Sequence, residues 1–126
     1  MAKIMIIEDN PVHKVLLSHI MEDLGYEPLG FFDVESARGE LKDQMPDFFI
    51  IDMQLAESMK GTTAFIKDLH QSRYSRDIPV VIVSAHVPWE NIKDGLPWFK
   101  PENVIEKPFN IESISRIVKE LLNGKK

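Results

Sequence analysis

The chain contains no cysteine, and this absence removes several kinds of chemistry at once. Disulfides, thiolate zinc sites, iron–sulfur clusters and cysteine nucleophiles all need a thiol. Apolar runs long enough for a membrane span or a secretory signal are also missing. Basic residues are the minority, with 15 Lys and Arg against 20 Asp and Glu, so the net charge is −5. We therefore expect a soluble, cytoplasmic protein that binds neither nucleic acid nor membranes.

The composition that remains is that of a folded domain. The chain has 126 residues, of which 44% are hydrophobic and 28% charged, so it can bury a core, and we expect a folded rather than a disordered chain. This length fits one domain of ordinary size. We find no repeat, low-complexity tract or linker, and we expect residues 1–126 to form a single domain with no effector domain.

Short apolar runs alternate with helical patterns along the chain. Unbroken runs of four apolar residues at 4–7, 48–51 and 80–83 predict strands that are covered on both faces. A weaker run at 26–32 and a short one at 104–105 complete a set of five. Strands that alternate with helices give a parallel sheet with helices on both faces, so the sequence predicts an α/β fold around a five-stranded parallel sheet.

Capping residues predict where the first and last helices begin and end. Asn10 caps the first helix, with Pro11 at its first position, and Gly25 ends it. Asn110 caps the last helix and Gly124 ends it. We expect the apolar stripes of both helices to pack on the sheet rather than to bind a partner. The stripe of the first helix is Val12, Leu16, Ile20 and Leu24, and that of the last is Ile111, Ile114, Ile117, Val118, Leu121 and Leu122.

The helices between these two are less regular. A second helix is expected over residues 34–44, and a third is expected to start at a Thr62 cap, with Phe65, Ile66 and Leu69 on its inner side. Three prolines and a glycine in the segment 86–103 break the fourth helix. At best a short helix remains over 89–94. The segment also holds three aromatic residues, which either pack under an irregular loop or form a docking patch: Trp89, Trp98 and Phe99.

Polar residues stand where four of the predicted strands end. Glu8 and Asp9 follow the first strand, Asp52 the third, Ser84 the fourth and Lys107 the fifth. In a parallel sheet these ends lie on one edge, and open α/β sheets bind ligands beyond that edge. We therefore expect three carboxylates, a hydroxyl and an ammonium group to converge there.

The chemistry of such a cluster is restrictive. Crowded carboxylates repel one another unless one is protonated or a cation neutralises them. With oxygen ligands and no thiolates, Mg²⁺ is the natural cation, and it usually shares its site with phosphate oxygens. A lysine and a hydroxyl nearby suit a phosphoryl group in transfer. One carboxylate can then act as the nucleophile and form an acyl phosphate.

These residues resemble the conserved set of the response-regulator receiver domains of two-component signalling. The resemblance is carried by Glu8-Asp9, Asp52, Ser84 and Lys107-Pro108-Phe109, in this order and each near a predicted strand end. It spans the chain from Ile4 to Leu122. It implies a doubly wound, flavodoxin-like (βα)5 fold, here with an irregular fourth helix.

The resemblance also implies roles for individual residues. Asp52 matches the phosphoacceptor, and Glu8 and Asp9 match the acidic pair that holds Mg²⁺ together with Asp52 and the backbone carbonyl of Gln54. In the same way, Ser84 and Lys107 match the residues that bind the phosphoryl group.

The resemblance also bears on positions around these residues. The bond between Lys107 and Pro108 is usually cis in the family, which would direct the lysine into the site. Gln54 and His86 match positions near the phosphoryl group, where they would tune dephosphorylation. The histidines are scattered along the chain, and we expect none of them to bind a metal: His13, His19, His70 and His86.

The chain departs from the family pattern in three places. Ala56 replaces a usual proline and Gly61 comes one residue late, which predicts a longer, more mobile loop after Asp52. Val104 replaces the usual aromatic residue three positions before the lysine, so the common ring-turning switch cannot operate. The fourth helix is broken. We expect retained phosphoryl chemistry and a remodelled readout surface.

The leading hypothesis is therefore a phosphoacceptor rather than an enzyme. It would take a phosphoryl group from a histidine kinase or phosphotransfer protein in a phosphorelay, and signal by binding an unidentified downstream protein. A weak homodimer is a further candidate assembly. One alternative is a receiver fold that binds its partner constitutively, without phosphorylation. Another is a Mg²⁺-dependent phosphatase, for which we find no residue placed as the acid/base beside the nucleophile.

Overall fold

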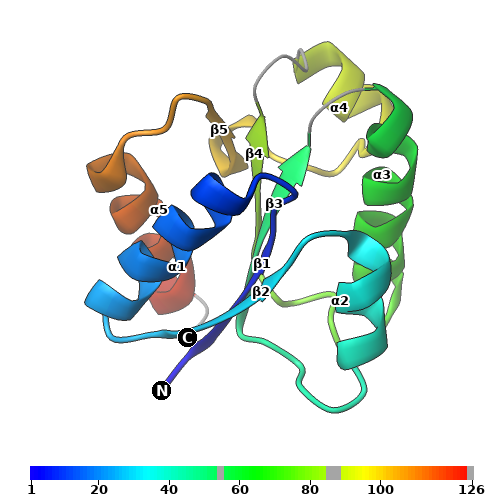
Figure 1. Cartoon of the computed structure of the whole chain (residues 1–126). Coiled ribbons are helices and arrows are strands. Elements are labelled where there is room, and N and C mark those ends of the chain that lie inside the picture. The colour runs from blue at the N-terminus through cyan, green and yellow to red at the C-terminus, as the bar shows by residue number, and fades with distance from the viewer. Residues whose placement is uncertain (54–55, 85–88, 125–126) are drawn as a thin grey trace.

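A single parallel sheet with helices on both faces forms the body of the computed structural model, which describes residues 1–53, 56–84 and 89–124 (Figure 1). The strand order β2-β1-β3-β4-β5 is the doubly wound order expected from the resemblance. The elements in chain order are β1 (Lys3–Ile7), α1 (Pro11–Asp23), β2 (Glu27–Phe31), α2 (Val34–Glu40), β3 (Phe48–Met53), α3 (Ala56–Gln71), β4 (Val80–Ser84), α4 (Trp89–Gly95), the 3-10 helix η1 (Pro101–Asn103), β5 (Val104–Glu106) and α5 (Ile111–Gly124).

Two apolar cores lie on opposite faces of this sheet. Helices α1 and α5 cover one face, and α2, α3 and α4 cover the other (Figure 1). Successive side chains of a strand point to opposite faces, so Ile4 and Ile6 of β1 face α1 and α5, while Met5 and Ile7 face the other core. All four are buried, which confirms the prediction that unbroken apolar runs mark strands covered on both sides.

Helix α1 begins as predicted, but the face that it buries matches the predicted stripe only in part. The Asn10 side chain accepts hydrogen bonds from the backbone N–H groups of Val12 and His13, as an N-cap does. The predicted stripe is confirmed at Ile20 and Leu24, which join the core, and wrong at Val12 and Leu16, which are 71% and 38% exposed. A spacing of four residues turns about 40° past a full turn at each step, so such a row winds away from the core. The residues of α1 that are buried are Leu17, Ile20 and Met21.

Helices α2 and α3 correct the sequence prediction at their ends. α2 ends at Glu40 rather than at residue 44, with Gly39, a weak helix former, in its last turn. α3 begins at Ala56, so Thr62 lies inside the helix and does not cap it. The loop predicted to be longer and more mobile is limited to residues 54–55, between β3 and α3, and these lie outside the described residues. The stretch 56–60 is rich in good helix formers, which favours the earlier start. The predicted inner side of α3 is confirmed, since Phe65, Ile66 and Leu69 are buried.

The segment around α4 is short and irregular, as predicted. Helix α4 has seven residues, and η1 follows before β5. Phe99 is buried in the core beside α3, and Trp89 packs against the same core. Trp98 stacks on His70 of α3, with 3.9 Å between ring centroids. These aromatic residues therefore pack against the fold, as the packing interpretation predicted.

Helix α5 follows the prediction closely. Asn110 Oδ1 accepts hydrogen bonds from the backbone N–H groups of Glu112 and Ser113. Ile114 and Val118 are buried against the sheet, whereas Ile111, in the first turn, is 55% exposed. Among the described residues, no helix combines the length and the apolar character that crossing a membrane requires.

Candidate functional site

Strand alternation brings Glu8 and Asp52 to the same face of the sheet. Ile6 and Ile50 are register partners on neighbouring strands, and both face α1 and α5. Two residues further on, Glu8 and Asp52 therefore continue the same rows at the carboxyl edge, with Asp52 still inside β3 and Glu8 just after β1. The strands involved, β1 and β3, lie side by side where the chain reverses its winding direction, which is the switch point at which doubly wound sheets bind ligands.

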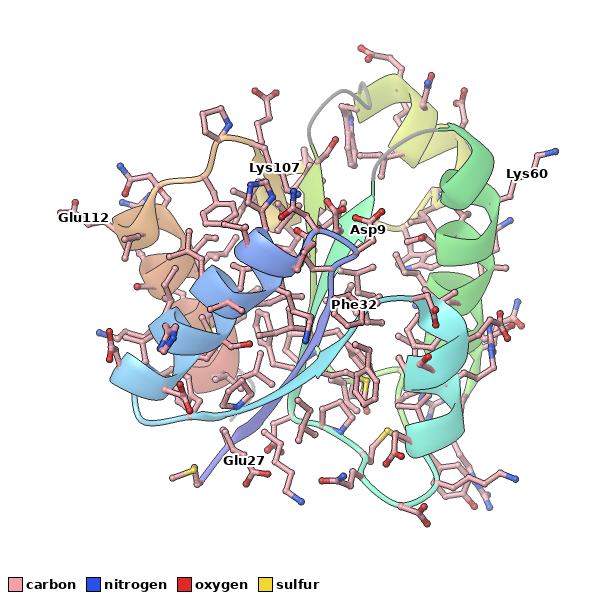
Figure 2. All side chains as sticks on the ribbon, viewed as in Figure 1. Asp9, Glu27, Phe32, Lys60, Lys107 and Glu112 are labelled. Carbon is pink, nitrogen blue, oxygen red and sulfur yellow. The ribbon has the colours of Figure 1, made fainter. Side chains whose placement is uncertain are left out.

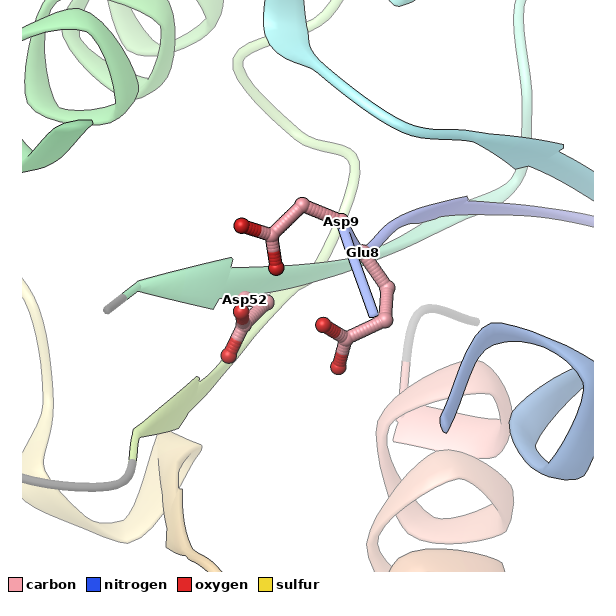
Figure 3. Close-up of side chains that lie close together, drawn as sticks. All are labelled: Glu8, Asp9 and Asp52. Atoms are coloured by element: carbon pink, nitrogen blue, oxygen red, sulfur yellow. The ribbon is translucent and has the colours of Figure 1, made fainter. Parts of the chain in front are cut away.

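Three carboxylates meet at this point (Figure 3). One oxygen each from Glu8, Asp9 and Asp52 lies within 4.8 Å of the other two. Glu8 is 1% and Asp52 9% exposed, whereas Asp9 is open to solvent. The backbone fixes Glu8 on both sides: its N–H donates to Phe31 O at 2.9 Å, and its Oε2 accepts from Asn10 N at 3.2 Å.

Lys107 supplies the positive charge of the cluster, reaching it from the loop after β5 (Figure 2). Its Nζ lies 2.8 Å from Glu8 Oε1 and 3.2 Å from Asp52 Oδ1, and its side chain is 8% exposed. The backbone N–H of Lys107 donates to Ser84 O at 2.7 Å, which ties this loop to the end of β4. The bond to Pro108 is cis, as the resemblance implied.

The electrostatics of the site leave Asp52 poorly neutralised. Burial, and next the charge of Glu8, raise the pKa of Asp52 from 3.8 to about 7, against the opposing effect of Lys107. Burial lowers the pKa of Lys107, but its hydrogen bond to Glu8 and the charges of Asp52 and Glu8 outweigh this, and the pKa rises above its ordinary value. Lys107 therefore stays charged, while the ionised form of Asp52 needs further stabilisation.

One carboxylate oxygen of Asp52 likewise lacks stabilising partners among the described residues. Oδ1 is buried and accepts no hydrogen bond from any residue within the described ranges. Lys107 Nζ is 3.2 Å away, but it approaches outside hydrogen-bond alignment, so it stabilises this oxygen chiefly through its charge. Three converging carboxylates with one under-satisfied buried oxygen fit a small, hard cation that takes oxygen ligands.

Of the other predicted site residues, the structure describes Ser84. Ser84 lies at the same edge, is 3% exposed, and pairs in register with Met53, the residue after Asp52. Alternation assigns its side chain to the face of Ile82, the face that α3 covers, rather than to that of Asp52. Gln54 and His86 lie outside the described residues.

His13 belongs to this site, although its position in the sequence did not indicate it. Its Nδ1 lies 3.0 Å from Lys107 Nζ and 3.9 Å from Glu8 Oε1. The side chain comes from the first turn of α1, which starts beside the acidic pair. The one signal in the sequence was this proximity, four residues after Asp9.

Comparison with known proteins agrees with this architecture. A model of the response regulator receiver domain family matches residues 4–119. The chain belongs to this family. Receiver domains are phosphoacceptor signalling modules of two-component systems rather than classical enzymes.

Curated bacterial regulators are similar in sequence to this receiver. It is 28% identical over 120 residues to the phosphate regulon transcriptional regulatory protein PhoB of Escherichia coli, with 95% of this chain and 51% of PhoB covered. The chain thus spans about half the length of that relative. It is 29% identical over 123 residues to the polar-differentiation response regulator DivK of Brucella anthropi, with 94% of each covered.

Solved receivers share the fold. The signal receiver domain of a signal transduction histidine kinase from Syntrophus aciditrophicus superposes with a TM-score of 0.83 at 26% identity, covering 98% of this chain and 92% of that one. The receiver domain of a sensor histidine kinase from Pseudomonas aeruginosa gives a TM-score of 0.80 at 20% identity, covering 97% and 98%. That structure has a magnesium ion coordinated in its active site cleft.

The raised pKa of Asp52 predicts a pH-dependent stability when divalent cations are removed with a chelator. Between pH 3.8 and about 7, the unfolded receiver has released a proton that the folded receiver still holds on Asp52. Each increase in pH through this window therefore favours the unfolded state, and this contribution to stability falls. The free energy of unfolding, measured by chemical denaturation across this pH window, should fall more steeply with rising pH in the wild type than in Asp52→Asn. Equal slopes of this free energy against pH would contradict the raised pKa of Asp52.

Proposed function

We propose that this receiver accepts a phosphoryl group on Asp52 from a histidine kinase or phosphotransfer protein and signals through binding to another protein. The observation that carries the proposal is the cluster itself, in which a buried carboxylate on β3 lies between two further carboxylates and the Lys107 ammonium. Nucleophile and charge-stabilising groups thus converge at one edge of the sheet, as phosphoryl transfer requires. Membership of a family of phosphoacceptor modules supports the same role.

In the proposed step, an oxygen of the Asp52 carboxylate attacks the phosphorus of a phosphohistidine on the donor. The new P–O bond forms as the P–N bond breaks, and the donor imidazole keeps the electron pair of that bond. Lys107 lies close enough to compensate the negative charge of the phosphoryl oxygens. Water later hydrolyses the acyl phosphate, which releases inorganic phosphate and restores the carboxylate.

We assign Mg²⁺ to the three carboxylates of Glu8, Asp9 and Asp52, with the backbone carbonyl of Gln54 as a further proposed ligand. When bound, the ion supplies positive charge that neutralises the acids and the phosphoryl oxygens. The donor set supports this, since it is all oxygen and its carboxylate oxygens lie within 4.8 Å of one another. The shortage of neutralising partners at Asp52 supports it further.

Intact-mass measurement tests the proposed function directly. The chain is incubated with acetyl phosphate and a Mg²⁺ salt, and its mass is compared with that of a sample that also contains a chelator. We expect the mass of one phosphoryl group to be added in the first sample and none in the second. Beryllofluoride, which mimics an acyl phosphate, should also bind in a Mg²⁺-dependent way. Failure of both would reject phosphorylation and favour the constitutive binding module, for which the short α4 and Val104 argue.

Asp9→Asn is expected to weaken Mg²⁺ binding by about tenfold or more, because it removes one of three charged ligands. Asp9 is exposed, so the variant should fold normally. The Mg²⁺ concentration that half-saturates the rise in melting temperature reports the affinity. Asp43→Asn removes an exposed acidic side chain from the segment between α2 and β3, and it is the matched control. An unchanged half-saturation in Asp9→Asn would remove Asp9 from the metal site.

A further inference from the structure

Besides Glu8 and Asp52, Lys107 contacts His13, which has no role in the proposed phosphoryl transfer. Its Nζ lies 3.0 Å from Nδ1 of His13, in addition to 2.8 Å from Glu8 Oε1. A lysine ammonium has three N–H donors and no acceptor. Nδ1 must therefore accept this hydrogen bond, and the proton of the neutral imidazole lies on Nε2.

The ring of His13 is itself held in place. Its backbone N–H donates to the N-cap oxygen of Asn10 at 3.1 Å, which fixes the first turn of α1. Phe109 meets the ring edge-on, with 6.0 Å between centroids and an interplanar angle of 70°. Phe109 in turn packs against the core beneath α1 and α5. The segment after β5 thus contacts the His13 ring at two residues, Lys107 and Phe109.

We propose that His13 is a positioning residue that, together with Glu8, orients the Lys107 ammonium toward the phosphoryl group on Asp52. The three N–H bonds of an ammonium group point in fixed tetrahedral directions. When His13 and Glu8 accept two of them, the group no longer rotates, and the third N–H remains for an oxygen of a phosphoryl group on Asp52, whose own Oδ1 lies 3.2 Å from Nζ but outside hydrogen-bond alignment. A donor held before reaction needs no reorganisation during it. The inference rests on the proposed function of Asp52 and Lys107.

The tautomer of His13 tests the contact without any phosphorylation. Long-range ¹H–¹⁵N correlation spectroscopy of the full chain with ¹⁵N-labelled histidine distinguishes the two ring nitrogens. We expect a protonated Nε2 and a bare, hydrogen-bonded Nδ1, whose resonance shifts in Lys107→Ala. A neutral ring with its proton on Nδ1, or a resonance indifferent to Lys107→Ala, would overturn the proposal.

Two substitutions test the positioning role. His13→Leu keeps the bulk but removes the acceptor, whereas His13→Asn keeps an acceptor oxygen near the place of Nδ1. Loss of a hydrogen bond to a charged group predicts a phosphorylation rate with acetyl phosphate that is about tenfold lower in His13→Leu. His13→Asn should restore most of the rate. His19→Leu, on the same helix with its side chain 70% exposed, should match the wild type.

The outcomes separate the proposal from its alternatives. A wild-type rate in His13→Leu would reject any role in positioning Lys107. A rate as low in His13→Asn as in His13→Leu would mean that ring packing on Phe109, not the acceptor, is what matters, and would also reject it. If His13→Leu does not fold, His13→Asn against the wild type and the tautomer decide. If the wild type itself gained no phosphoryl mass, the proposed function would fail, whereas the tautomer would still decide whether His13 holds Lys107.

Discussion

Asp52→Asn is expected to take up no phosphoryl group under conditions in which the wild type gains one. The amide carries no charge and its oxygen is too weak a nucleophile to form the acyl phosphate. Intact mass after incubation with acetyl phosphate and a Mg²⁺ salt measures the difference. The Asp43→Asn variant makes the same chemical change at an exposed acid, and it should be phosphorylated like the wild type.

The same substitution should leave the receiver folded, and in the absence of metal more stable. Asp52 is 9% exposed, and both burial and Glu8 disfavour its charge, so an uncharged side chain of the same shape relieves the cluster. Thermal unfolding with a chelator should show a higher melting temperature than that of the wild type. Loss of phosphorylation then cannot be attributed to unfolding. Uptake of phosphate by Asp52→Asn at the wild-type rate would place the acceptor on another residue.

The position of the acidic cluster could be predicted from the sequence because the place of a residue in a strand largely fixes where its side chain lies. An apolar run such as 48–51 fixes the strand, and a parallel sheet brings all carboxyl ends to one edge. Alternation does the rest, since Asp52 falls two residues after Ile50 and Glu8 two after Ile6. The predicted meeting of Glu8, Asp9 and Asp52 is confirmed by this geometry.

The helices were harder to predict, because their faces depend on accumulated rotation and their ends on competing local preferences. In α1, the four-residue spacing predicts Val12 and Leu16 in the core, where the structure instead buries Leu17 and Met21. In α3, Thr62 suggests an N-cap, but the helix continues before it through Gly61. A glycine inside a helix costs only about 1 kcal/mol, and the residues before it favour the helix enough to offset that.

The contact between His13 and Lys107 lay beyond prediction for another reason. The two residues are 94 positions apart, and their meeting depends on how the first turn of α1 is rotated and on the extended form of a long side chain. Neither follows from a pattern of residue types. The resemblance to receivers predicted a role for Lys107 but none for His13, so their contact could be seen only in the structure.

Lys107→Ala is expected to lower the free energy of unfolding by about 3 kcal/mol or more in metal-free solution, because it strands a buried charge. The Glu8 carboxylate is fully buried, and its ammonium partner lies 2.8 Å away. Denaturant unfolding measures the loss. Lys60→Ala, which removes an exposed lysine of α3, should stay within about 0.5 kcal/mol of the wild type.

A double-mutant cycle identifies the buried charge as the cause. If Glu8 is the stranded group, Glu8→Gln in the Lys107→Ala background should recover most of the stability, so that the double variant is far less destabilised than the sum of the two single changes. Mg²⁺ should also stabilise Lys107→Ala more than the wild type, because the proposed ion neutralises the same acids. A loss of only about 0.5 kcal/mol, the value for an exposed ion pair, would mean that Lys107 resides in solvent and that neither Glu8 nor His13 holds it at the site.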